Sequence, residues 1–331
     1  HRDLHSFPTR RSSDLVIAES DLNDVRVLIP EAQNGLGLDA QWSDDFHHSL
    51  HALLTGERQG YYADFGRVGD LVRALQEGFV YSGQYSVFRR RRHGSPSGSR
   101  PASQFVVFSQ NHDQAGNRAL GERLSTLVDL ESLKLAAGVV LLSPYIPLLF
   151  MGEEYGEKAP FLYFVSHSDE ALVESVRSGR RQEFKLAVGD GVIPDPQSPE
   201  TFARSKINWE LRQEGLHHIL CRYYRELIHI RTRFSAFSVD NDENREVWRL
   251  EAQPVIVSRR WTAHLSHEAL CLFNFEQDDI LVSHAESFLG GSWYRVLDSS
   301  DEQWAGPGNE PFRDPVDRKS TRLNSSHVSE S

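Results

Sequence analysis

Apolar residues follow two different patterns along the first two thirds of the chain. Short unbroken apolar runs at 16–18, 105–108 and 147–151 each stop at polar residues, which is typical of strands buried on both faces. Elsewhere apolar residues recur at helical spacing, and this predicts amphipathic helices. Those helices are expected over 46–54, 71–79, 130–140, 172–176 and 216–230. Capping residues support the first of these helices, because Ser43 or Asp44 precedes it and Gly56 follows it.

Polar side chains with chemical potential follow the strand at 105–108. Asp113 is preceded by His112 and followed by Asn117 and Arg118. In a (β/α) barrel, catalytic groups lie at the C-terminal ends of the strands, because the packed barrel holds them while the next loop opens to substrate. An ordinary turn and helix cap is the alternative interpretation of Asn-His-Asp.

A second carboxylate favours the catalytic interpretation. Glu19 stands at the end of the strand at 16–18. Cleavage of a glycosidic bond requires one carboxyl group to protonate the leaving oxygen and others to stabilise an oxocarbenium-like transition state. We therefore expect Glu19 and Asp113 to project from neighbouring barrel strands into one sugar-sized cleft.

Four blocks of sequence resemble a known family. VIAESDLND at 16–24 resembles the acid/base block of the alpha-amylase family of glycoside hydrolases, and FSQNHDQAGNR at 108–118 resembles its His-Asp block. More narrowly, residues 37–66 and LLFMGEEYGE at 148–157 resemble the maltooligosyltrehalose trehalohydrolases within that family. The resemblance extends from about residue 16 to about residue 233.

This resemblance implies a reaction and a set of site residues. It implies retaining hydrolysis of the α-1,4 bond next to the terminal trehalose of maltooligosyl trehalose, or action on a related α-glucan. Glu19 is the implied general acid and then base, and Asp113, assisted by His112, the implied stabiliser of the transition state. The further substrate contacts that we predict are Trp42, Asp44, Asp45, Phe46, His47, His48, Tyr61, His112, Gln114, Asn117 and Arg118. Aromatic faces suit the apolar C–H faces of glucose, and core packing is the alternative for Trp42 and Tyr61.

The same resemblance predicts the domain organisation. Residues 16–236 correspond to strands five to eight of a (β/α)8 TIM barrel, so the expected fold class is α/β, the C-terminal half of a barrel followed by a small domain. Beyond Phe237 the apolar period changes from 3.6 to 2, which indicates an antiparallel β-sandwich domain over 237–317. Residues 1–15 and 318–331 resemble translated adapter or vector sequence, and we interpret them as non-native tails.

The resemblance also predicts what the chain lacks. Alpha-amylase family enzymes carry their nucleophile, an aspartate with a nearby arginine, on the strand before the acid/base residue. Nothing upstream of Val16 matches that block, and Asp14 is not accepted in its place. We therefore expect the chain to be an inactive fragment of a glycosidase.

Composition excludes several other classes of function. The net charge of −11 disfavours nucleic acid as a partner, and we interpret RRRRH at 89–93 as a solvated loop. The apolar segment 135–151 is interrupted by two prolines and is short of the ~20 residues that a membrane span needs. With two cysteines and no CxxC pair, a disulfide framework is not indicated and a cytoplasmic location is expected.

No cofactor or metal is implied by the remaining motifs. His47 and His51 are four residues apart, but HExxH is absent and no third ligand is indicated. The chain also lacks a phosphate-binding loop and a dinucleotide fingerprint. The oligomeric state is unknown from sequence. Two other functions stay open, namely a branching or amylase-type enzyme of the same family and a non-catalytic carbohydrate-binding protein.

Overall fold

The structure is a computed structural model. It describes residues 14–188, 193–238, 244–250, 253–263, 267–276, 280–281, 293–308, 322–323 and 327–330. The segment 1–15, interpreted as a tail, therefore lies almost wholly outside the described residues.

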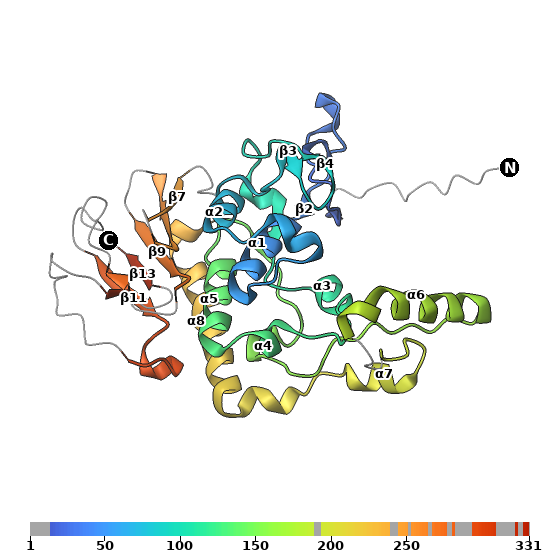
Figure 1. The fold of residues 1–331 in the computed structure, drawn as a ribbon. Coiled ribbons are helices and arrows are strands. Elements are labelled where there is room, and N and C mark those ends of the chain that lie inside the picture. The colour runs from blue at the N-terminus through green and yellow to red at the C-terminus, as the bar shows by residue number, and fades with distance from the viewer. Residues whose placement is uncertain are drawn as a thin grey trace.

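A four-stranded parallel sheet forms the centre of the larger part of the molecule (Figure 1). Its order is β1-β2-β5-β6, and each neighbouring pair is parallel. The strands are β1 (Ile17–Ala18), β2 (Ala40–Trp42), β5 (Phe105–Val107) and β6 (Ile146–Pro147). The last strand lies earlier than the predicted 147–151, although Leu148 N still donates to Val107 O at 2.8 Å. The pattern of parallel strands separated by helices confirms the α/β class.

Helices follow the strands and cover the sheet. They are α1 (Asp44–Thr55), α2 (Val68–Glu77), α3 (His112–Gly116), α4 (Leu124–Leu127), α5 (Leu130–Leu141), α6 (Glu170–Val188), α7 (Pro199–Arg204) and α8 (Gly215–Arg233). The hydroxyl of Ser43 accepts from Phe46 N at the start of α1, and Gly56, with φ of 76°, ends that helix. The predicted caps of α1 are therefore confirmed. Apolar residues of α1, α2, α4, α5, α8 and the sheet share one continuous core.

Short 3-10 helices and a hairpin complete this part of the chain. The 3-10 helices are η1 (Val25–Val27), η2 (Glu31–Gln33), η3 (Gly60–Asp64), η4 (Ala102–Gln104), η5 (Glu153–Tyr155), η6 (Trp209–Gln213), η7 (Ser235–Phe237) and η11 (Glu302–Trp304). The hairpin pairs β3 (Ser82–Ser86) with β4 (Arg91–Gly94) in antiparallel register. The prediction of a solvated loop at 89–93 is therefore wrong for its last three residues.

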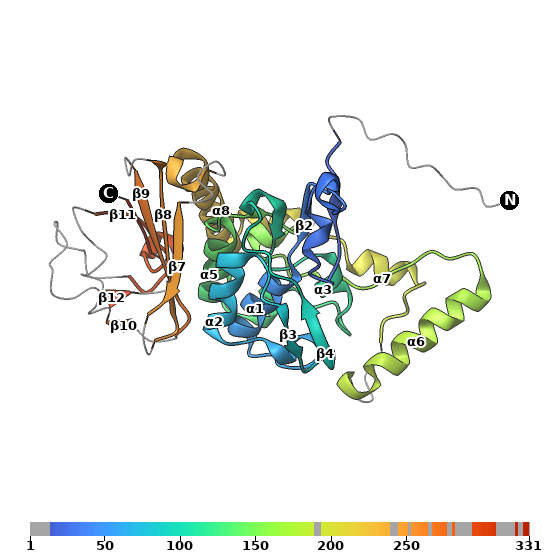
Figure 2. The ribbon, with the colours of Figure 1, turned by 90° about the horizontal axis from the view of Figure 1, so that it is seen from above.

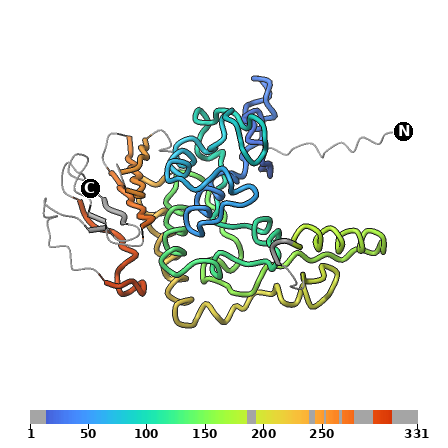
Figure 3. The backbone as a smooth tube through the Cα atoms, viewed as in Figure 1, coloured from blue at the N-terminus to red at the C-terminus, as the bar shows by residue number. Residues whose placement is uncertain are grey.

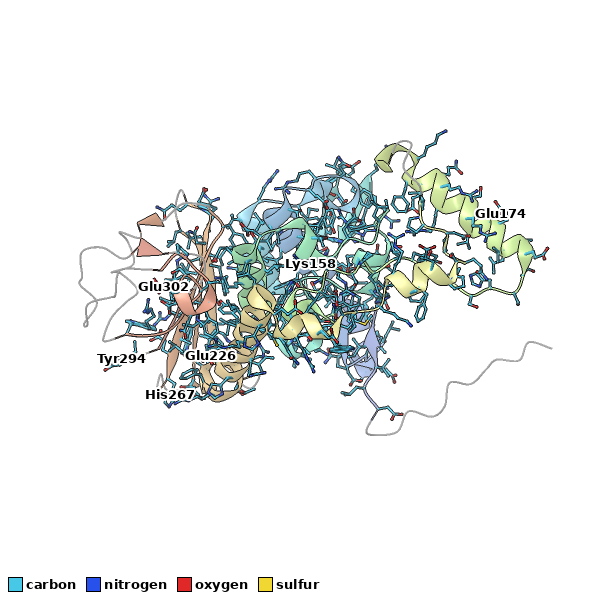
Figure 4. All side chains as sticks on the ribbon, turned by 90° about the horizontal axis from the view of Figure 1, so that it is seen from below. Lys158, Glu174, Glu226, His267, Tyr294 and Glu302 are labelled. Carbon is cyan, nitrogen blue, oxygen red and sulfur yellow. The ribbon has the colours of Figure 1, made fainter. Side chains whose placement is uncertain are left out.

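Helix α6 also differs from the prediction. We expected a short helix over 172–176 that stops at Gly179, but α6 continues through this glycine to Val188. No atom lies within 4 Å of the position that a Cβ would take at Gly179, so the residue costs the helix only its propensity, about 1 kcal/mol. Figure 3 shows α6 extending away from the body of the molecule, and Glu174 is exposed on it (Figure 4).

The C-terminal part contains an antiparallel sheet beside α5 and α8 (Figure 2). Its order is β11-β13-β9-β8-β7, and β10 pairs separately with β12. The strands are β7 (Arg245–Arg249), β8 (Val255–Trp261), β9 (Glu268–Asn274), β10 (Ile280–Leu281), β11 (Tyr294–Asp298), β12 (Arg322–Leu323) and β13 (His327–Glu330). The antiparallel pairing is confirmed, whereas the sandwich arrangement stays a prediction. The interpretation of 318–331 as a non-native tail also stays a prediction. Strand β13, which lies within this segment, pairs with β9 and β11.

A buried lysine joins the two parts. The Lys134 ammonium on α5 is fully buried and donates to Ser299 O at 2.6 Å and to Trp304 O at 2.9 Å. The Glu131 carboxylate, 2.7 Å from the Lys134 ammonium, and the two carbonyl partners compensate for the removal of this charge from water. The C-terminal sheet is therefore held against the helices by polar contacts as well as by apolar packing. No helix in the described part of the chain is long and apolar enough to cross a membrane.

Candidate active site

The end of β1 presents Glu19 to solvent. β1 ends at Ala18, which pairs with Gln41 on β2. The amide of Gln41 donates to Ser20 O at 2.8 Å, so the chain on both sides of Glu19 is bonded to β2. The carboxylate itself stays 61% exposed. Its backbone is thus fixed while its side chain is open to a ligand.

Three strand ends meet around this carboxylate. His112, which begins α3 four residues after Phe108, places Nε2 3.8 Å from Glu19 Oε1, and the imidazole is 52% exposed. The Trp42 ring at the end of β2 lies edge-on to His112 with centroids 6.0 Å apart. Sequence segments about ninety residues apart therefore meet on one side of the sheet. We expected Glu19 and Asp113 to project from neighbouring strands. That expectation is wrong, because β2 lies between β1, which precedes Glu19, and β5, which precedes Asp113.

Asp113 is held by the first turn of α3. The Asn111 side chain caps this helix and accepts from the backbone N of Asp113 at 2.8 Å and of Gln114 at 3.2 Å. Asn117, one turn later, donates from Nδ2 to Asp113 Oδ1 at 2.6 Å. The sequence Asn-His-Asp is therefore both a helix cap and the place where the exposed Asp113 is presented. The two interpretations of this motif do not exclude one another.

Asp44 extends the acidic side of the site. Burial raises the pKa of this carboxyl to about 7, and Asp45, Asp113 and Asp21 raise it further through their negative charges. Gln114 Nε2 donates to Asp44 Oδ1 at 3.4 Å and opposes that rise. The bond from Gln114 shows that Asp44 lies beside α3. Asp44 is also near enough to Asp113 for the charge of Asp113 to raise its pKa.

Three of the predicted substrate contacts point into the protein. Asp45 is buried and accepts from Val80 N and Tyr81 N at 2.7 and 2.8 Å, and burial raises its pKa to about 6. Phe46 is fully buried, with its ring edge-on to Tyr145. His47 is 1% exposed. Residues 45–52 of α1 are all buried, so this part of the helix packs into the core on every side. We therefore remove all three residues from the candidate contacts.

An aromatic cluster behind the site contains His48 and Tyr61. The His48 ring stacks on Tyr61 with centroids 4.7 Å apart and lies 5.3 Å from Phe65. Burial lowers the pKa of His48 to about 3, with a smaller contribution from His51. His48 is thus neutral and buried, whereas Tyr61 keeps a partly exposed face. Among the residues that the structure describes, no group of three or more His, Cys, Asp or Glu is arranged to hold a metal ion.

Arg118 has carboxylate partners of its own. Its guanidinium binds Glu57 through two hydrogen bonds of 2.9 Å and lies 3.4 Å from Glu122. Glu57 Oε2 also accepts from His51 Nε2 at 2.8 Å. A bidentate pair of this kind fixes a planar guanidinium. Arg118 therefore ties the end of α3 to the segment after α1, and its place as a substrate contact stays a prediction.

We expect Glu57→Gln to lower the free energy of unfolding at pH 7. Hydrogen bonds from His51 and then Arg118 lower the Glu57 pKa to about 2 from 4.5, so the stabilisation is present above pH 4.5 and is lost as the pH falls toward 2. The difference between wild type and variant should shrink over that interval. Urea unfolding at pH 7, 4 and 3 measures it, and a difference that is the same at all three values would contradict this role.

Two features near the site were not among the predicted contacts. Arg89 at the tip of the β3–β4 hairpin donates to Asp21 Oδ2 at 2.8 Å, and His93 contacts Asp21 O at 2.8 Å. The hairpin thereby fixes the loop that follows Glu19. Glu153, after β6, is buried, and burial raises its pKa to about 8. It accepts from Phe150 N at 3.0 Å, so it caps its own turn.

Two cavities lie away from Glu19, His112 and Asp113. One of about 610 Å³ is lined by Gln76, Arg100 and Arg245 among others, and one of about 510 Å³ lies between α5 and α8. We place the candidate site at Glu19, His112 and Asp113 because exposed groups from separate strand ends converge there, which neither cavity offers.

A parallel α/β sheet that carries acidic groups at its strand ends is the arrangement of alpha-amylase-type proteins, and solved structures agree. The chain superposes on an alpha-amylase-like protein from Salmonella typhimurium with a TM-score of 0.77 and 33% identity, covering 96% of this chain and 51% of that one. A pullulanase from Anoxybacillus complexed with maltotriose has the same fold at a TM-score of 0.53 and 15% identity, over 91% of this chain and 35% of that one.

Curated relatives narrow the relationship. The chain is 53% identical over 220 residues to malto-oligosyltrehalose trehalohydrolase of Saccharolobus solfataricus, covering 66% of this chain and 37% of that protein. It is 45% identical over 249 residues to the trehalohydrolase of Arthrobacter ramosus, covering 73% and 43%. The predicted resemblance is therefore confirmed, and the chain is a relative of the malto-oligosyltrehalose trehalohydrolases. It spans about two fifths of the length of these proteins, and no family model matches it.

Proposed function

We propose that this chain supplies the acid/base side of a retaining glycosidase site that cleaves the α-1,4 bond next to the terminal trehalose of maltooligosyl trehalose. The observation that carries the proposal is the meeting of Glu19 with His112, whose facing atoms are 3.8 Å apart, at the ends of β1 and β5. Both side chains are more than half exposed, so a sugar can reach them. The names of the relatives supply the substrate.

Each group has a role that follows from its position. Glu19 protonates the glycosidic oxygen as the bond to the leaving sugar breaks, and then accepts a proton from the water that completes hydrolysis. Asp113, oriented by Asn117 and by the Asn111 cap, binds ring hydroxyls and stabilises the positive charge that develops on the sugar. Trp42, beside His112, offers an aromatic face to the ring.

The nucleophile is a separate part of the proposal. Retention of configuration requires a second carboxylate roughly 5–5.5 Å from the acid. Our proposal assigns that group to sequence outside this chain, because no block of the chain resembles the nucleophile segment of the family. Asp44 does not take this role, since it follows β2, the strand after the acid/base strand, whereas the family nucleophile precedes it.

Two preparations test this proposal. We expect the purified 331-residue chain to release no trehalose from maltooligosyl trehalose. We expect release from an exchanged enzyme, in which this chain's matched segment replaces the matched 220 residues of the Saccharolobus solfataricus relative. Sugar chromatography measures both, and trehalose from the chain alone would contradict the missing nucleophile.

The same assay separates the alternatives. Transfer of glucan to a new chain by the exchanged enzyme, without trehalose, would indicate a branching enzyme. Unchanged activity after replacement of Glu19 would indicate a carbohydrate-binding segment without a catalytic role. Either result would contradict the proposed function.

A further inference from the structure

A small cavity lies between α1 and α3. It offers about 10 Å³ to the centre of a water-sized molecule, and polar side chains from both helices line it. His47 and Gln114 are 1% and 7% exposed. His47 Nδ1 and Gln114 Oε1 are buried and have no hydrogen-bond partner in the protein. The residues that carry these two orphaned atoms therefore line one cavity, which has about the room that a single water molecule needs.

The side chains that line the cavity indicate which molecule binds in it. A buried polar atom without a partner is costly, and buried water commonly bonds two to four such atoms. Burial lowers the pKa of His47 well below its usual value, and the charges of His51 and His48 lower it further. The imidazole is therefore neutral, and a neutral ring and an amide oxygen are partners for water rather than for an ion. Tyr62 and Gln110 add polar side chains to the lining. Its two charged residues, Arg118 and Glu122, form an ion pair at 3.4 Å with one another.

We propose that one buried water molecule bridges His47 Nδ1 and Gln114 Oε1, and that this bridge fixes the Gln114 amide so that its Nε2 faces Asp44. The amide has two orientations that differ by half a turn. In the observed one, Nε2 donates to Asp44 Oδ1 at 3.4 Å, and Oε1 is buried with no hydrogen-bond partner in the protein. The opposite orientation would place the amide oxygen against the Asp44 carboxyl, where neither group donates when Asp44 is ionised. The water removes this ambiguity, which makes Gln114 a positioning residue for Asp44.

The bridge has a measurable effect on Asp44. Burial raises the pKa of this carboxyl most, the charges of Asp45, Asp113 and Asp21 raise it further, and the hydrogen bond from Gln114 lowers it. Removal of the amide in Gln114→Leu is expected to raise the Asp44 pKa by roughly one unit, the effect of losing one hydrogen bond to a carboxylate. His47→Phe keeps a ring of similar size but removes Nδ1. It should raise the same pKa by less, because the amide then samples both orientations.

The experiment uses the 331-residue chain and needs no catalytic activity, so it stands or fails apart from the proposed function. A crystal structure of the wild type should contain one water within hydrogen-bonding distance of both atoms. Carboxyl NMR titration should give the two pKa shifts, and the double variant should match Gln114→Leu alone. Leu127→Val, an apolar change in the same lining, should leave the Asp44 pKa unchanged.

Three results would overturn the proposal. The first is a dry cavity in the wild-type crystal structure, which does not depend on the folding of any variant. The second is a folded His47→Phe variant with the wild-type Asp44 pKa. The third is an equal shift in Leu127→Val, which would show that general loosening of the cavity, and not the bridge, controls Asp44.

Discussion

Glu19→Gln is expected to lower kcat for trehalose release by at least about 10²-fold in the exchanged enzyme, because glutamine cannot deliver a proton to the leaving oxygen. The side chain keeps its size, and the backbone around it stays bonded to β2 through Gln41 and Ser20. Substrate binding should therefore change far less than kcat. Steady-state kinetics with maltooligosyl trehalose measure kcat and KM separately.

Glu31→Gln is the matched control for this prediction. Glu31 is an exposed glutamate in η2, twelve residues after Glu19, and the same chemical change there should leave kcat unaltered. A Glu19→Gln enzyme that keeps more than about a tenth of the wild-type kcat would contradict the assignment of Glu19 as the acid. A purely structural role would predict losses of stability rather than of kcat.

His48→Phe is expected to make the protein more resistant to acid. The His48 pKa is about 3 in the folded chain and 6.5 as the reference value, so below pH 6.5 the unfolded state binds a proton that the folded state does not. The stability of the wild type therefore falls through this group as the pH falls from 6.5 to 3. The slope is about 1.4 kcal/mol per pH unit, and phenylalanine removes it.

The measurement is a difference between two proteins. Between pH 6 and pH 4, the free energy of unfolding of His48→Phe should rise by roughly 2–3 kcal/mol relative to wild type, while Asp44, Asp45 and Glu153 contribute equally to both. Phe65→Leu, in the same aromatic cluster, should lower stability by a similar amount at each pH. If the free energies of unfolding of His48→Phe and wild type differed by the same amount at every pH, the buried neutral state of His48 would be contradicted.

Local signals predicted much of the fold. The ends of α1 could be predicted because Ser43 and Gly56 act on their own helix through single hydrogen bonds and a left-handed backbone. The end of α6 could not, because the effect of Gly179 depends on its surroundings, and it lies where no atom is close. The strand at 91–94 was missed because a run of arginines shows no alternation of polar and apolar residues.

The candidate site was predictable in part. Glu19 and His112 could be brought together because strand ends in a parallel sheet share one edge, although the intervening β2 could not be read from the sequence. Asp45, Phe46 and His47 were predicted as contacts because they lie in a block that resembles the trehalohydrolases. Their burial was missed because the apolar spacing predicted a helix with one buried face, whereas residues 45–52 of α1 are all buried. The partners of Arg118 were missed because Glu57 is sixty-one residues away in sequence.

A crystal structure of the Glu19→Gln exchanged enzyme with maltooligosyl trehalose bound tests the single sugar site directly. We expect the oxygen of the α-1,4 bond next to trehalose to lie about 3 Å from the side chain of residue 19, the distance that proton transfer requires. Hydroxyls of the adjoining ring should contact Asp113. Substrate bound away from these residues, or residue 19 and Asp113 in contact with different parts of the protein and not with one sugar, would contradict the account.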